Sequence, residues 1–356
     1  MPRPTVRQAF VVLALIGGGS VPPAALPAAA AAELPGLGVK LNETSVSGLS
    51  SGAYMAGQLQ MAHSKDIIGA GLVAGGPFAC AETESSRLLP YWPVVLWQNA
   101  MQAANLCMKV EWGTPDARKL AGRAEELAAA SDIDTLDGVA DDKVYLFSGD
   151  EDVTVRREVV EAAQAFYAAV GVPPERIVMV RSEGGHAFLT ETEGTACGLS
   201  KEPFLSDCDY DQAKAILEWI YGPLDAPSPS PQGEFIVFDQ TPFGGGAVNG
   251  LANEGVVYVP PACVNHKGCR LHIVLHGCKQ ARESVGNDFV EKSGFARWAD
   301  TNRLVLLFPQ IAGSVVNPNG CWDWWGYNGI DYLSKDAPQI AAIWAMAERL
   351  AMDPAP

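Results

Sequence analysis

The sequence has few basic side chains for its length, and they do not form clusters. Its 356 residues include 25 Lys and Arg against 41 Asp and Glu, which gives a formal charge of −16. Most of such a surface would repel a polyanion such as nucleic acid, and an anionic membrane surface as well. The charge balance therefore argues against nucleic-acid and membrane partners and favours a neutral one.

Other patterns are also missing. No Cys-x-x-Cys pair occurs and no cysteine accompanies paired histidines, so the sequence lacks the usual signature of a zinc site, and we expect neither a metal ion nor a cofactor. No internal repeat of the kind that builds a solenoid is visible. With 48% hydrophobic and 19% charged residues, the chain can bury a sizeable core, which excludes disordered, collagen-like and coiled-coil proteins.

The first thirty-odd residues are typical of a secretory signal. Arg3 and Arg7 precede the apolar residues 9–16, and the small residues 24–32 offer a cleavage site. We expect residues 1–32 to be removed on export, which places the remaining chain outside the cell or in the periplasm. A retained membrane anchor is the alternative, but the apolar stretch is short for one, and no other stretch is long and apolar enough to span a bilayer.

The chain has eight cysteines, an even number that suggests disulfide bonds in an oxidising compartment. Eight cysteines permit about 105 connectivities. Pairing neighbours along the chain suggests four bonds: Cys80–Cys107, Cys197–Cys208, Cys263–Cys269 and Cys278–Cys321.

Short apolar runs alternate with helical patterns, which predicts an α/β fold with a mostly parallel sheet flanked by helices. The expected strands are residues 44–47, 67–74, 143–148, 176–180, 234–239, 256–259, 270–276 and 304–308. The expected helices are residues 51–63, 117–129, 155–170, 210–221, 289–301 and 337–350.

Residues 225–233 contain three prolines and two serines, so we expect an extended, exposed linker or surface loop. About four expected strands precede this segment and about four follow it. Two interpretations follow: two domains of similar kind, or one sheet whose halves are joined here.

Gly48-Leu49-Ser50-Ser51-Gly52 lies between an expected strand and an expected helix, the context that a Gly-x-Ser-x-Gly nucleophile elbow requires. Small flanking residues permit the sharp turn that exposes the Ser50 hydroxyl. The backbone amide of Ser51, at the start of the helix, would then face an oxyanion formed there. An ordinary Gly/Ser turn is the alternative.

A nucleophilic serine needs an acid and a base, which in α/β-hydrolases follow it in the order Asp or Glu, then His. Asp152, which follows the strand 143–148, is the candidate acid, and Asp150 is its nearly equal competitor. Both acids could instead cap the next helix. His186, in a glycine-rich loop after the strand 176–180, is the candidate base.

His276-Gly277-Cys278 ends the strand 270–276 and resembles the loop that supplies a second oxyanion amide. That loop normally precedes the serine, whereas here it comes long after Ser50. If the Cys278 amide has this role, the chain is circularly permuted, its halves share one sheet and the joint lies near residues 225–233. The alternative is a structural turn in a separate second domain.

Four aromatic residues lie between Trp322 and Tyr327, in a segment that follows Cys321. Aromatic surfaces in a cleft suit a neutral, partly apolar acyl chain. Some of these rings could instead fill the core. A Cys278–Cys321 bond would hold them beside the proposed oxyanion site.

The sequence resembles extracellular poly(3-hydroxybutyrate) depolymerases of the single-domain, circularly permuted type. The resemblance covers essentially residues 33–356 and rests on five motifs in one order: Ser-Val-Ser-Gly-Leu-Ser-Ser-Gly-Ala-Tyr-Met-Ala (45–56), Val-Tyr-Leu-Phe-Ser-Gly (144–149), Gly-Gly-His-Ala-Phe (184–188), Leu-His-Gly-Cys (275–278) and Gly-Cys-Trp-Asp-Trp-Trp-Gly-Tyr (320–327).

The resemblance implies a serine esterase of the α/β-hydrolase fold that cleaves this polyester or its oligomers. The residues it implies are the triad Ser50, Asp152 and His186, the oxyanion amides of Ser51 and Cys278, and a substrate-contacting tryptophan among Trp322, Trp324 and Trp325. A feruloyl or acetylxylan esterase and a non-catalytic polyester-binding protein are the alternatives. Longer bacterial members add polymer-binding domains; we expect none here, which favours soluble oligomers or amorphous polyester.

Overall fold

The computed structural model describes residues 31–84, 87, 91–246, 248–264 and 267–354. The expected signal sequence, apart from its last two residues, lies outside the described residues. In the described part of the chain, no helix combines the length and the hydropathy needed to cross a bilayer.

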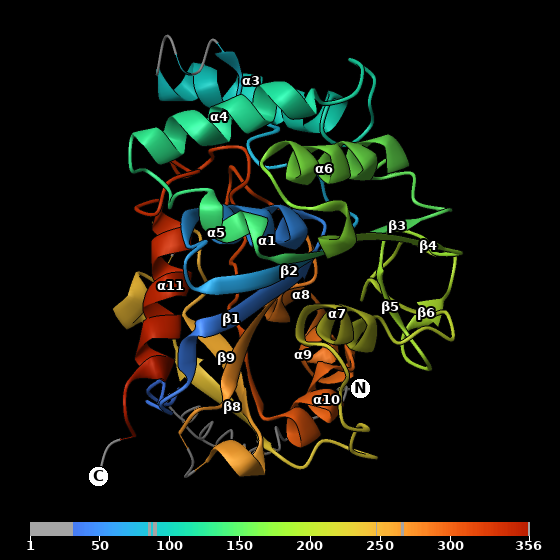
Figure 1. The fold of residues 1–356 in the computed structure, drawn as a ribbon, viewed down its shortest axis with the longest axis vertical. Helices are drawn as coiled ribbons and strands as arrows, with labels where there is room; N and C mark the ends of the chain where they lie inside the picture. Colours follow the sequence, from blue (N-terminus) through green and yellow to red (C-terminus); the bar gives the residue numbers. More distant parts are fainter. Residues whose placement is uncertain (1–30, 85–86, 88–90, 247, 265–266, 355–356) are drawn as a thin grey trace, which may run out of the picture. The chain divides into compact units, whose positions relative to one another are not determined.

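One eight-stranded sheet contains strands from both sides of residues 225–233 (Figure 1). Its strands, in spatial order, are β4 (Ile177–Ser182), β3 (Lys143–Gly149), β2 (Ile67–Val73), β1 (Lys40–Leu49), β10 (Arg270–Leu275), β11 (Leu304–Phe308), β9 (Glu254–Val259) and β8 (Glu234–Asp239). The pairs from β4 to β11 are parallel, whereas β9 pairs antiparallel with both of its neighbours. The prediction of a mostly parallel sheet is confirmed.

The strand sequences are apolar because the sheet is buried on both faces. In β3, Val144 and Leu146 pack on one side and Tyr145 and Phe147 on the other. Successive side chains of a strand point to opposite faces, so a strand covered twice has a continuous apolar sequence.

Helices cover both faces of the sheet (Figure 1). The first face packs against α1 (Ser51–Ala62), α6 (Arg157–Ala169) and α11 (Pro338–Ala351), and the second against α7 (Gln212–Tyr221), α9 (Asp288–Lys292) and α10 (Phe295–Asn302). Beyond α1 lie α3 (Trp92–Asn105) and α4 (Ala117–Ala129). Shorter elements include α5 (Asp137–Ala140), α8 (Arg282–Val285) and a small sheet of β5 (Phe188–Thr190), β6 (Thr195–Ala196) and β7 (Leu205–Asp207).

One expected helix is divided in the structure, and the proline-rich segment is tethered to part of it. The single helix expected over 289–301 is divided into α9 and α10, because Gly294 adopts a φ of 90°, which an α-helix cannot contain. The proline-rich segment 225–233 is largely exposed but tethered to α10: the Ser228 amide donates to the Arg297 carbonyl at 3.0 Å and its hydroxyl to Asp300 at 2.8 Å.

Candidate active site

Ser50 occupies a strained turn between β1 and α1. Its φ of 57° is unusual for a residue with a side chain, and Ser50 as a whole is 8% exposed. A Cβ at Gly48 would lie 2.3 Å from the Gly52 carbonyl, and a Cβ at Gly52 would lie 2.4 Å from the Leu275 carbonyl oxygen. Only glycine fits at both flanks, as the nucleophile-elbow interpretation requires.

Asp152 is the acid that faces His186. Its Oδ2 lies 2.8 Å from Nδ1 of His186, and its Oδ1 accepts the amides of Thr154 and Val155 at 2.8 and 2.9 Å. Asp150 instead forms an ion pair with Arg157 at 2.6 Å. Because a carboxylate only accepts hydrogen bonds, Nδ1 carries the imidazole proton and leaves Nε2 as the acceptor.

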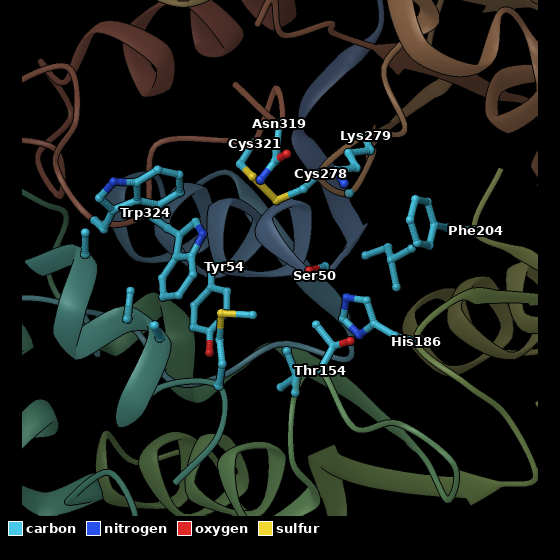
Figure 2. Close-up of a pocket in the computed structure, with 18 of the residues that line it drawn as sticks. Ser50, Tyr54, Thr154, His186, Phe204, Cys278, Lys279, Asn319, Cys321 and Trp324 are labelled. Atoms are coloured by element: carbon cyan, nitrogen blue, oxygen red, sulfur yellow. A yellow bond between two sulfur atoms is a disulfide. The ribbon is translucent and has the colours of Figure 1, made fainter. Parts of the chain in front are cut away.

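Ser50 and His186 line the same pocket, which has a volume of about 460 Å³. Figure 2 shows the His186 imidazole turned toward the Ser50 hydroxyl, with Thr154 beside it. The structure therefore brings together three side chains from three loops, each of which follows a strand of the parallel part of the sheet: β1, β3 and β4.

The loop that carries Cys278 follows β10, which pairs directly with β1. Gly48 is in register with Leu275, so the loop after β10 follows the same sheet edge as the Ser50 turn. Cys278 lines the pocket, and Ser51 begins α1. Among the described residues, neither the Ser51 nor the Cys278 amide donates to a backbone carbonyl, so both can donate to an oxyanion.

His276 holds this loop rather than taking part in acid–base chemistry. Its Nε2 accepts the Ile311 amide at 3.2 Å, so its Nδ1 carries the proton and donates to the Gly277 carbonyl at 2.7 Å. Burial lowers the pKa of His276 to about 4. The ring therefore remains neutral at physiological pH.

The disulfide Cys278–Cys321 links this loop to the aromatic segment 320–327. Trp322 is fully buried and its Nε1 donates to the His276 carbonyl at 2.9 Å, so it belongs to the core. Trp324 and Trp325 line the pocket, and Trp324 stacks on Tyr54 with ring centroids 4.0 Å apart (Figure 2).

Asp323 fixes the backbone of the aromatic segment. Its Oδ1 accepts the amides of Gly326 and Tyr327, each at 2.8 Å, and its Oδ2 accepts that of Asn328 at 3.0 Å. Burial raises the pKa of Asp323 to about 7, while these amides act to lower it. This carboxyl holds the loop that carries Trp324 and Trp325 in place.

The structure contains four disulfide bonds: Cys80–Cys107, Cys197–Cys208, Cys263–Cys269 and Cys278–Cys321. These are the pairs suggested by neighbouring positions along the chain. No cysteine of the described residues is free.

Several pocket residues gave no functional signal in the sequence: Tyr54, Ala100, Ala103, Met108, Phe204 and Lys279. Helix α3, which carries Ala100 and Ala103, was itself not predicted. Its inward positions Val95, Asn99 and Ala103 have helical spacing, but they include an asparagine and a small alanine, which weakens the apolar pattern.

No protein-family model matches the chain. The chain is 39% identical over 348 residues to "Poly(3-hydroxybutyrate) depolymerase" of Delftia acidovorans, an alignment that covers 96% of this chain and 65% of that protein. It is 33% identical over 338 residues to "Polyhydroxybutyrate depolymerase" of Talaromyces funiculosus, covering 90% of this chain and 93% of that protein. The chain thus spans less than two thirds of the Delftia protein and nearly all of the Talaromyces one.

Two solved structures are similar as well. One is a PHB depolymerase from Penicillium funiculosum and the other a PHB depolymerase variant complexed with an R3HB trimer. Each has a TM-score of 0.78 and 32% sequence identity, and each match covers 90% of this chain and 98% of the other. With the mostly parallel sheet flanked by helices, this likeness confirms the predicted α/β-hydrolase fold. The chain belongs to the poly(3-hydroxybutyrate) depolymerase family.

Proposed function

We propose that the protein is a secreted serine esterase that hydrolyses poly(3-hydroxybutyrate) or its oligomers. The observation that carries this proposal is the 2.8 Å hydrogen bond between His186 and Asp152, in a pocket that Ser50 also lines. The R3HB trimer bound in a similar structure supports a hydroxybutyrate ester as the substrate.

In the first half of the reaction, the Ser50 hydroxyl attacks the ester carbonyl and gives its proton to Nε2 of His186. Asp152 stabilises the imidazolium that forms. The carbonyl oxygen becomes an oxyanion, which accepts hydrogen bonds from the amides of Ser51 and Cys278. When the tetrahedral intermediate collapses, the alkoxy group leaves and takes the proton from His186, so a product with a free hydroxyl end departs.

In the second half, water attacks the acyl group on Ser50. His186 removes a proton from this water and returns it to the Ser50 oxygen as the acyl bond breaks. A product with a free carboxyl end is released and the enzyme is restored.

The substrate contacts belong to the same proposal. Trp324 and Trp325, with Met108, give the pocket a largely apolar wall that suits the methyl-bearing backbone of hydroxybutyrate. Trp322 is buried in the core, so we assign the substrate contact to Trp324 or Trp325.

We also propose that residues 33–356 form a single catalytic domain, circularly permuted, with its joint at 225–233. Support comes from the position of β8 to β11 in the same sheet as β1 to β4. The Cys278 loop also follows Ser50 in the sequence, whereas the corresponding loop normally precedes the serine. The residues 1–32 act as a signal peptide in this proposal. Four disulfide bonds are in keeping with an oxidising compartment.

The test is a set of paired hydrolysis assays on a hydroxybutyrate trimer, a feruloylated sugar and acetylxylan. We expect the wild type to cleave the trimer fastest and Ser50→Ala to lose turnover by roughly 10⁴-fold or more. Ser293→Ala is the matched control, because Ser293 is a buried serine outside the pocket whose hydroxyl has no partner within the described structure. Faster cleavage of either carbohydrate ester, or turnover by Ser50→Ala, would refute the assignment.

A further inference from the structure

We infer that Gln280 is a positioning residue that couples the proposed oxyanion loop to the loop of the proposed base; the inference rests on the function proposed above. Gln280 is 1% exposed and follows Cys278 by two residues. It does not line the pocket. Its side chain makes three hydrogen bonds, all to backbone groups, and these join two loops far apart in the sequence.

The first contact fixes the oxyanion loop. Oε1 of Gln280 accepts the Gly277 amide at 2.7 Å. The next peptide unit, which joins the Gly277 carbonyl to the Cys278 amide, is held at its oxygen by Nδ1 of His276 at 2.7 Å and by the Gln280 amide at 3.3 Å. In a trans peptide the carbonyl and the amide point in opposite directions. Fixing the Gly277 oxygen therefore also fixes the direction of the Cys278 amide.

The other two contacts reach residues 203–204, which adjoin the start of β5, just after His186. Nε2 of Gln280 donates to the carbonyls of Pro203 and Phe204, each at 3.0 Å. The Phe204 carbonyl also accepts the amide of Phe188, two residues after His186, at 2.9 Å. Phe204 has a φ of 54° and its side chain lines the pocket beside His186 (Figure 2).

One buried carboxamide thus links the peptide that precedes the proposed oxyanion donor to the segment that follows the proposed base. Oε1 accepts one hydrogen bond and Nε2 donates two, so a residue without polar atoms would deprive the Gly277 amide and the Pro203 and Phe204 carbonyls of their side-chain partner. A small shift of the Cys278 amide would reduce the stabilisation of the transition state more than the affinity for substrate, because the oxyanion exists only during the reaction.

Gln240 offers a matched control. It is fully buried and makes the same set of bonds: its Oε1 accepts the Gln310 amide at 3.0 Å, and its Nε2 donates to the carbonyls of Ala252 and Gln310 at 2.8 and 3.1 Å. It does not line the pocket. Leucine at either position removes equivalent hydrogen bonds, but only Gln280 adjoins the proposed oxyanion loop.

The test is to measure kcat and KM of Gln280→Leu and Gln240→Leu with p-nitrophenyl butyrate, a small ester that needs no polymer contact. We expect Gln280→Leu to lose kcat by roughly 10- to 100-fold with KM within about threefold, and Gln240→Leu to keep both values within about threefold. Should leucine at position 280 prevent folding, the pair Gln280→Glu and Gln240→Glu repeats the comparison with the side-chain volume preserved. The inference would be overturned if the Gln280 variant and its matched Gln240 variant had equal kcat, or if the Gln280 variant changed only in KM.

This result can be separated from that of the proposed function. If the wild type hydrolyses p-nitrophenyl butyrate but not the hydroxybutyrate trimer, the proposed substrate is refuted. The role of Gln280 is then still tested by comparing kcat of the Gln280 and Gln240 variants. Absence of wild-type turnover on both esters would overturn both proposals.

Discussion

Two acids in one loop, Asp150 and Asp152, have different partners and should have different effects on catalysis. We expect Asp152→Asn to lower kcat by about 10⁴, because an amide that faces Nδ1 favours the wrong imidazole tautomer. Asp150→Asn removes only partly exposed ion pairs with Arg157 and Arg181, so its kcat should remain within about threefold of the wild type. Steady-state kinetics on a hydroxybutyrate oligomer would measure both. A larger loss in Asp150→Asn would show that the acid has been assigned to the wrong residue.

A buried carboxyl away from the pocket should make stability depend on pH. Burial raises the pKa of Asp142 to about 8, against the lowering effect of a hydrogen bond from Gln60, 2.7 Å long. The folded chain then holds a proton that the unfolded chain releases near pH 4. The free energy of unfolding should therefore fall as the pH rises from about 4 to 8, by at most about 1.4 kcal/mol per pH unit.

Urea unfolding of the wild type and Asp142→Asn at several values between pH 5 and 8 would measure this effect. Since the amide does not titrate, the variant should gain stability relative to the wild type as the pH rises. A constant difference between the two proteins across this range would mean that Asp142 is ionised in the folded state.

At the scale of elements, α3 combines a pocket wall with an exposed apolar surface. Ala100 and Ala103 line the pocket, while the side chains of Trp97 and Met101 face solvent, with Trp97 66% exposed. An exposed apolar surface of this kind, continuous with a site, marks a place of contact. We expect α3 to contact the surface of amorphous polyester while part of a polymer chain enters the pocket.

Trp97→Ala tests this proposal. We expect its adsorption to amorphous polyester particles to weaken roughly five- to tenfold, because the indole would no longer be buried against the polymer. Its kcat on a soluble oligomer should stay close to the wild type. Met352→Ala, which truncates a comparably exposed side chain after α11, is the control and should adsorb normally. Equal adsorption of the two variants would argue against α3.

The elements that sequence patterns located well are the buried strands. The strands expected at 234–239 and 304–308 have those bounds in β8 and β11. β1 extends from Lys40 to Leu49, well beyond the expected residues 44–47, because its polar residues interrupt the apolar pattern. Ser45 and Ser47 are satisfied by hydrogen bonds to His272 of β10, 2.6 and 2.9 Å long, which no local pattern could indicate.

At the scale of the whole molecule, the site depends on contacts between distant parts of the chain. The order of serine, acid and histidine was visible in the sequence because each residue follows a recognisable strand. The sequence favoured Asp152 over Asp150 only narrowly, and the hydrogen bond from His186 to Asp152 distinguishes the two acids. Gln280 and Phe204 had no local signal at all, since their contact forms only where the loop after β10 meets the residues just before β7.

The central claim is that Ser50 is the nucleophile of a pocket assembled from both halves of the chain. Its most direct test is to treat the protein with a p-nitrophenyl phosphonate ester, map the adduct by peptide mass spectrometry and measure the remaining hydrolysis of a hydroxybutyrate trimer. The account predicts one adduct, on Ser50, with trimer hydrolysis lost in proportion to labelling. Full hydrolysis by the labelled protein, or an adduct on another residue accompanied by loss of activity, would contradict it.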